Sequence, residues 1–217
     1  MTEPRKTHSV DVLSILLEAQ NKYSRDIDFT IPRRGIQGKK KLSISKGAFL
    51  HIRELFENAV TYGITPPQGE PVQCSISIDD GAMIIETQNE SPPINLAPLK
   101  KKFIAAVREN RVARENDGSL WVCGSESEVA DRIKSGLACG MVSQEEIELS
   151  LKENPNVLLF VGRLSGHESE DRPGGIGLYL VRKMAREGGG DLTFSCRTHD
   201  SGHTVKFTLT LPVFEDI

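Results

Sequence analysis

The residues best suited to bind a phosphate are glycines near the C-terminal end of the sequence, at positions 174, 175 and 177. The glycine-rich turn leads straight into apolar residues at helical spacing, and the segment stops at three further glycines, 188–190. Glycines at a helix start let backbone N–H groups approach a ligand closely, and the helix dipole there favours an anion. A tightly packed helix with no ligand can show the same pattern, so both interpretations stay open at this point.

A second pair of chemically useful side chains lies on a segment with helical periodicity, residues 45–62. Glu54 and Asn58 are four positions apart, so they stack on one face of the expected helix. An acid and an amide held together beside a phosphate site can orient an attacking group and hold a magnesium ion. The alternative is a solvated helix face with no chemical role.

Composition excludes several classes of protein. The chain has 217 residues, 38% apolar and 26% charged, which is ordinary for a globular protein with a hydrophobic core. A formal net charge of −3 argues against nucleic-acid binding driven by phosphate neutralisation, and no apolar run is long enough to span a bilayer. The four cysteines form no CxxC pair, so we expect free thiols and a cytoplasmic location.

The elements that must position these residues follow from periodicity and turn signals. Helices are expected at 9–23 and 45–62, strands at 27–31, 72–78, 83–87, 192–196 and 205–211, and a polar turn at 88–94. Residues 95–156 read as helices with loops, with helices expected at 96–108, 127–136 and 143–151 and a capping box at the start of the third, Ser143. A short apolar run lies at 42–44, and the run 157–161 fits either a buried strand or a helix. This order predicts a single domain over residues 1–217 of the α+β class. It would be a two-layer sandwich whose mixed or antiparallel sheet is covered on one face by helices.

Several separated pieces of the sequence resemble the GHKL ATPases, the family of gyrases, heat-shock chaperones and histidine kinases. Residues 54–59 (ELFENA) resemble the family's N box, and residues 175–181 (GIGLYLV) its second glycine box. Residues 89–94 stand where the family has its first glycine box, and 202–212 resemble its last strand, so the similarity covers about residues 26–213. Within the family the chain most resembles histidine-kinase ATPase domains of the chemotaxis type, with anti-sigma serine kinases as the alternative.

The resemblance implies a Bergerat-type ATP-binding fold and a role for each matching residue. Asn58 would bind Mg²⁺, and Glu54 would activate the attacking group. Residues 1–25 would form an N-terminal helical extension, and residues 95–172 an enlarged helical insert that includes the ATP lid. The other implied nucleotide contacts are adenine packing by Tyr62, adenine hydrogen bonding by Asn89 with Thr204 nearby, phosphate binding by Gly174, Gly175 and Gly177, and further contacts from Ser91 and Leu178.

The sequence also departs from the family pattern. Asn89 replaces an aspartate, so its hydrogen bond to adenine loses charge assistance. Ser91 and Pro93 replace both glycines of the first box, and Thr61 replaces a lysine common in histidine kinases.

Two functions of different classes follow. The first is a Mg-ATP-dependent kinase, and the sequence shows no phosphoacceptor motif of its own, so a partner protein would supply the acceptor in trans. The second is a degenerate, non-catalytic module that binds nucleotide or docks a partner. The sequence leaves the partner and the oligomeric state open.

Overall fold

The computed structural model describes residues 9–30, 42–62, 71–79, 81–91, 95–164, 168–169, 172–173, 177–199 and 202–215. These residues belong to two compact units. One unit combines Met1–Pro93 with Met184–Ile217 and is called the sandwich here, and the other, Ile94–Lys183, is called the insert. The boundary between them falls inside helix α7 (Gly177–Glu187).

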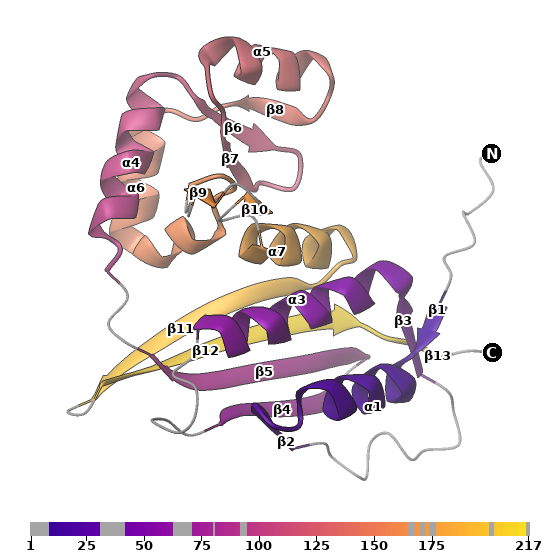
Figure 1. Ribbon diagram of the computed structural model, residues 1–217. Coiled ribbons are helices and arrows are strands. Elements are labelled where there is room, and N and C mark those ends of the chain that lie inside the picture. The colour runs from indigo at the N-terminus through magenta and orange to yellow at the C-terminus, as the bar shows by residue number, and fades with distance from the viewer. Residues whose placement is uncertain are drawn as a thin grey trace, which may run out of the picture. The chain divides into compact units, whose positions relative to one another are not determined.

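The sandwich is built on a mixed sheet of five strands in the order β11-β12-β5-β4-β2 (Figure 1). The strands are β2 (Ile27–Thr30), β4 (Val72–Asp79), β5 (Ala82–Ser91), β11 (Asp191–His199) and β12 (Gly202–Pro212). All neighbours pair antiparallel except β2 and β4, which are parallel. The predicted α+β class with a mixed sheet is therefore confirmed.

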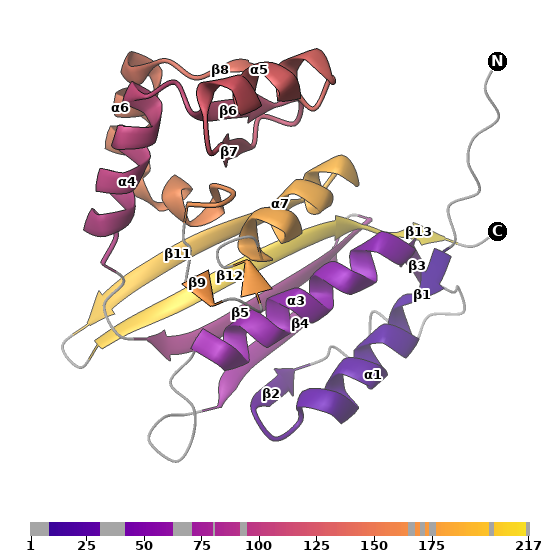
Figure 2. The ribbon, with the colours of Figure 1, turned by 45° about the horizontal axis from the view of Figure 1, so that its top comes forward.

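Helices α1 (Val12–Tyr23) and α3 (Lys46–Tyr62) lie on one face of this sheet, as Figures 1 and 2 both show. Alternate residues of β4 are buried and exposed, which is the pattern of a strand with one covered face. Phe56 of α3 is fully buried and packs edge-on against Phe29 of β2 and Tyr23 of α1, with ring centroids 5.5 and 5.9 Å away. This aromatic cluster joins both helices to the sheet.

A small second sheet joins the two ends of the chain. It has the strand order β1-β3-β13 and consists of β1 (Ser9–Asp11), β3 (Leu42–Ser45) and β13 (Phe214–Glu215). The sequence predicted only an apolar run at the position of β3 and helix at the position of β1. Such short strands form because distant segments supply their partners, which local periodicity does not reveal.

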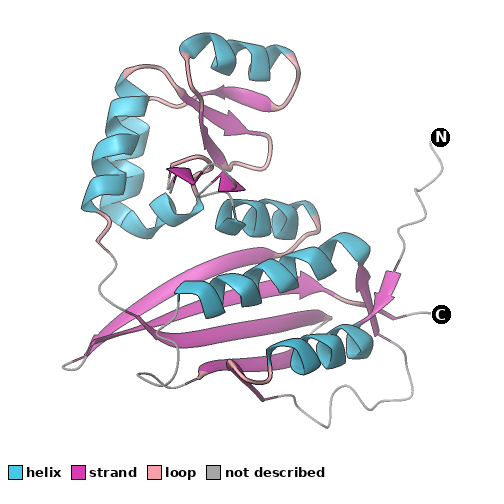
Figure 3. Cartoon of the chain, viewed as in Figure 1, coloured by secondary structure: helices cyan, strands magenta, loops and turns pink. Residues whose placement is uncertain are grey.

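The insert differs from the helical segment that the sequence predicted. Three of its helices were expected, namely α4 (Ala97–Arg108), α5 (Glu126–Lys134) and α6 (Gln144–Glu153). Between them lies a three-stranded antiparallel sheet, β7-β6-β8, which was not expected (Figure 3). Its strands are β6 (Val112–Glu115), β7 (Leu120–Val122) and β8 (Ala138–Met141), and they have only three or four residues each.

The insert has hydrophobic cores of its own. Phe103 and Val107 of α4 pack with Ile147 and Leu151 of α6 and with Leu158. Leu158 lies in a 3₁₀ helix, Pro155–Phe160, which resolves the ambiguous run as helical. Two short paired strands, β9 (Glu168–Ser169) and β10 (Arg172–Pro173), follow. The capping box predicted at Ser143 is present in part, because its hydroxyl accepts the N–H of Glu146.

The glycines after α7 end the helix as the sequence predicted. Gly189 has a φ of +85°, a left-handed conformation that suits glycine at a helix C-terminus. Gly190 lies so close to β12 that a Cβ there would stand 1.9 Å from the Thr210 carbonyl oxygen. Side chains are therefore excluded at Gly190 by backbone atoms that cannot rotate away.

We expect Gly190→Ala to lower the free energy of unfolding by about 3 kcal/mol, because the added methyl must push α7 or β12 aside. Urea denaturation followed by circular dichroism measures this. Gly188→Ala is the matched control, since a Cβ there would meet its nearest atom, the Ala185 carbonyl oxygen, at 3.4 Å. Equal stability of the two variants would contradict the packing described here.

Candidate functional site

One end of the sandwich gathers most of the residues that the sequence analysis selected. Helix α3 and strand β5 both end there, and β12 begins there (Figures 1 and 2). Helix α3 also contacts β5 directly. Asn58 lies near the end of α3, Asn89 near the end of β5, and Thr204 near the start of β12.

The antiparallel register between β5 and β12 decides which side chains face the helices. Val205 pairs with Asn89, and the pairing continues to Ser91. Residues 88–91 are therefore strand, and the expected turn at these positions is wrong, because β12 supplies hydrogen-bonding partners that the local sequence does not show. Asn89 is 9% exposed and lies on the same buried side of β5 as Thr87, which is fully buried.

Thr204 does not share the side of the sheet on which Asn89 lies. It pairs with Glu90, and its hydroxyl donates a hydrogen bond of 3.1 Å to the Glu90 carboxylate. Because side chains alternate along a strand, Val205 is the β12 residue beside Asn89. Buried residues alternate along β5 from Met83 and Ile85 onward. Continuing this alternation in the sequence would have identified Thr87, and the paired strand would have identified Val205.

Asn58 and Glu54 lie one helical turn apart on α3, and both side chains are partly buried. The Asn58 Nδ2 atom is buried and has no hydrogen-bond partner among the residues that the structure describes, and the same is true of the Thr87 hydroxyl. Native proteins rarely leave such groups unsatisfied, because each costs about 1–3 kcal/mol. A polar ligand or ordered water at this end of the sandwich would satisfy them.

Glu57, next to Asn58 in sequence, has a different environment. Its carboxylate accepts hydrogen bonds from Lys22 and Tyr23 of α1, both at 3.1 Å, and lies 3.4 Å from Arg53. Burial alone would raise the Glu57 pKa, but the Lys22 and Tyr23 hydrogen bonds and the nearby positive charges hold it below its ordinary value. Glu57 therefore fixes α1 to α3 and is not available for the chemistry suggested for Glu54.

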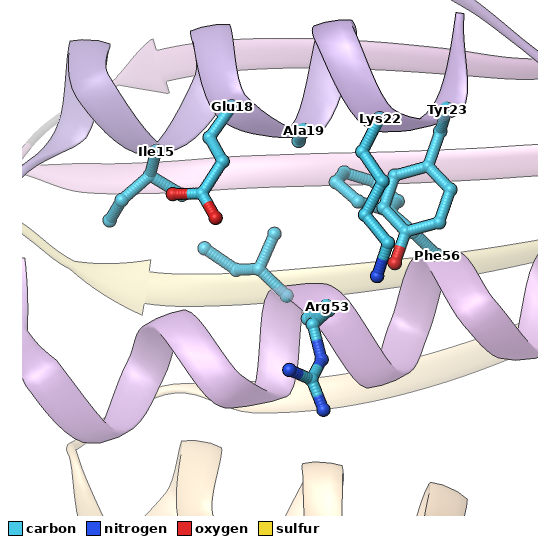
Figure 4. A pocket seen from close by; sticks show the side chains of 8 residues that line it. Ile15, Glu18, Ala19, Lys22, Tyr23, Arg53 and Phe56 are labelled. Atoms are coloured by element: carbon cyan, nitrogen blue, oxygen red, sulfur yellow. The ribbon is translucent and has the colours of Figure 1, made fainter.

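A hollow of about 100 Å³ lies between α1 and α3 (Figure 4). Ile15, Ala19, Ile52 and Phe56 supply its apolar lining, and the side chains of Glu18, Lys22, Tyr23 and Arg53 surround it. Ligand pockets for molecules of nucleotide size usually measure about 300–1,000 Å³. This hollow is too small for ATP and is not the site indicated by Asn58 and Asn89.

The remaining selected residues are described only in part. Gly174 and Gly175 lie outside the described residues, and for Tyr62 and Ser91 the structure describes the backbone alone. Gly177 is the first residue of α7, which agrees with the predicted glycine-rich helix start. Leu178 follows it and is partly exposed.

Asn58 and Glu54 carry side-chain oxygen atoms of the kind that Mg²⁺ binds. Mg²⁺ prefers oxygen ligands and commonly takes one or two from the protein and others from phosphates. Within the described ranges, no three His, Cys, Asp or Glu side chains are grouped so that they could hold a metal ion. The amide oxygen of Asn58 and the carboxylate of Glu54 are two such oxygen donors, one helical turn apart on α3.

Comparisons with known proteins give structural similarity without sequence similarity. No family model and no curated protein matches the sequence. Among solved structures, the chain is similar to the histidine kinase AdeS of Acinetobacter baumannii, with 11% identity and a TM-score of 0.43. The match covers 94% of this chain and 66% of the AdeS chain, just under two thirds. It is also similar to the histidine kinase domain of the E. coli osmosensor EnvZ (11% identity, TM-score 0.43), covering 98% of this chain and 92% of that one. Function does not follow from likeness at these values.

No helix in the described part of the chain is both long enough and apolar enough to cross a bilayer.

We expect Thr87→Val to raise the free energy of unfolding by about 1 kcal/mol, because it removes a buried hydroxyl that has no partner and keeps the side-chain shape. Thermal and urea denaturation measure the change. Thr208→Val on β12 is the control, since its hydroxyl donates to Glu86 at 3.4 Å and its removal should bring no gain. A loss of stability in Thr87→Val would show that the hydroxyl is satisfied in the ligand-free protein.

Proposed function

We propose that the chain is an ATP-binding domain of the histidine-kinase type, which phosphorylates a partner protein in trans within a cytoplasmic signalling system. The observation that carries this proposal is the pair of buried, unpartnered polar atoms on Asn58 of α3 and Thr87 of β5, together with Asn89 on the same side of β5 as Thr87. A fold that keeps buried, unsatisfied polar groups loses stability, and a bound ligand is a reason to retain them.

Asn58 and Glu54 would act on the phosphates and on the attacking group. The amide oxygen of Asn58 would hold Mg²⁺, whose charge neutralises the phosphates of the nucleotide. Glu54 would accept the proton of the attacking group, a role that a positioned carboxylate can perform. Most of the rate enhancement would come from positioning, as in other phosphoryl transfers.

The other selected residues would bind the nucleotide. The Asn89 carbonyl oxygen would accept a hydrogen bond from the adenine amino group, and Tyr62 would pack against the ring. The backbone N–H groups of Gly174, Gly175 and Gly177 would hold the phosphates at the start of α7, where the helix dipole favours negative charge.

The acceptor would be a side chain of another protein. A histidine and a serine acceptor differ chemically, because phosphohistidine is hydrolysed by acid and phosphoserine is not. Acid treatment of the labelled product therefore separates the histidine-kinase proposal from the serine-kinase alternative.

A non-catalytic binding module is the second candidate, and the surroundings of Asn89 favour it. Its Nδ2 atom donates to the backbone carbonyl of Glu90 at 3.4 Å, and the neighbouring β12 residue, Val205, has no hydroxyl to offer a base. Such a pocket would hold adenine weakly. Partner binding without consumption of ATP would identify this function.

We expect Asn58→Ala and Glu54→Gln each to reduce phosphate transfer roughly 100-fold, because one removes a metal ligand and the other a general base. The chain is incubated with γ-³²P-labelled ATP and with proteins that co-purify with it. The measurement is the loss of ³²P from ATP, counted as labelled protein plus labelled orthophosphate.

Glu57→Gln is the matched control for these variants. It removes a carboxylate from the same turn of α3, but that carboxylate is held by Lys22 and Tyr23 on the α1 side. It should keep transfer within about twofold of the wild type, because exposed ion pairs of this kind contribute little. Unchanged transfer in Asn58→Ala would contradict the proposal.

A further inference from the structure

The insert contains a buried carboxylate that the proposed function does not yet use. Glu115, the last residue of β6, is 1% exposed. It accepts hydrogen bonds from the Tyr179 hydroxyl, the Lys183 ammonium group and the Arg132 guanidinium group. A buried carboxylate is retained only where such partners compensate for lost hydration, so these four side chains form one interdependent cluster.

Two members of this cluster belong to α7. Tyr179 and Lys183 are four residues apart and therefore lie on the same face of the helix. The Tyr179 ring also packs on Trp121 of β7, with ring centroids 5.0 Å apart. Burial and the Glu115 hydrogen bond raise the pKa of Tyr179, so its hydroxyl stays protonated and remains a donor at physiological pH. The first two turns of α7 are thus fixed to the sheet of the insert.

The start of α7 is the part of the helix that phosphate binding would require. Helix α7 begins at Gly177, the last residue of the glycine-rich turn. The first N–H groups of a helix have no partner within it and point out from its N-terminus along the axis. Whatever fixes the direction of these two turns also fixes where those N–H groups point.

We propose that Glu115 is a positioning residue for the start of α7. Through Tyr179 and Lys183 it holds the N-terminal turns of α7 on the insert, and it couples the state of the insert to the affinity for the phosphates of a nucleotide. This inference rests on the proposed nucleotide-binding function. It also gives the insert a role, because a change that breaks the Glu115 cluster would release the helix start.

The test compares ATP with adenosine, which carries the same base and no phosphates. We expect Glu115→Gln and Tyr179→Phe each to weaken ATP binding about tenfold in isothermal titration and to leave adenosine binding unchanged. Tyr179→Phe is the gentler variant, because it removes one hydroxyl and keeps the ring that packs on Trp121. The fluorescence of Trp121, the only tryptophan, reports whether that packing persists.

Glu146→Gln is the matched control and should change neither affinity. It removes a carboxylate that pairs with Arg114, the neighbour of Glu115 on β6, in a pair that is much more exposed. Three outcomes would overturn the inference. ATP affinity unchanged in both variants removes the positioning role, and equal loss of ATP and adenosine binding in both shows a general structural role. Absence of ATP binding by the wild type overturns the proposed function itself.

Discussion

The register between β5 and β12 is the constraint on which the rest of the sandwich depends. Because side chains alternate along a strand, this pairing places Thr87 and Asn89 toward α3 and places Glu90 and Thr204 on the opposite side. A slip of one residue would exchange the two faces and bury Glu86 and Glu90 under the helices. The buried hydrophobic residues of the same strands, Met83 and Leu211 among them, make that slip costly.

The helices that cover this sheet make contacts that stabilise the fold, and one of them also carries a buried polar group that lowers its stability. The cluster around Phe56 and the Glu57 contacts to α1 secure both helices. Two residues after Phe56, the Asn58 amide has a buried nitrogen with no hydrogen-bond partner in the described part of the chain. Unsatisfied groups in an otherwise well-packed layer are expected at functional sites, where binding has been kept at the expense of stability.

The sequence predicted those elements whose signals lie within a few neighbouring residues. The amphipathic helices α1 and α3, the capped helix α6 and the glycine stop after α7 follow from spacing, capping and glycine conformation. Elements that depend on distant partners were missed. The strands of the insert have three or four residues and too little alternation to be recognised, and β5 runs on through polar residues because β12 pairs with it.

The same distinction applies to the candidate site. Glu54 and Asn58 could be placed together because they share one helix. Thr204 was expected near Asn89. The register of the two strands decides which of their side chains share a face of the sheet, and a local stretch of sequence does not reveal that register. The Glu115 cluster joins residues that are 64 and 68 positions apart, and no pattern within either segment indicates the other.

We propose that the sandwich binds a nucleotide at the end where α3 and β5 terminate. Isothermal titration of the wild-type chain with ATP, in the presence and absence of Mg²⁺, is the decisive measurement. Binding should be saturable and tighter with Mg²⁺. No binding up to about 1 mM ATP, or binding that Mg²⁺ does not change, would contradict it.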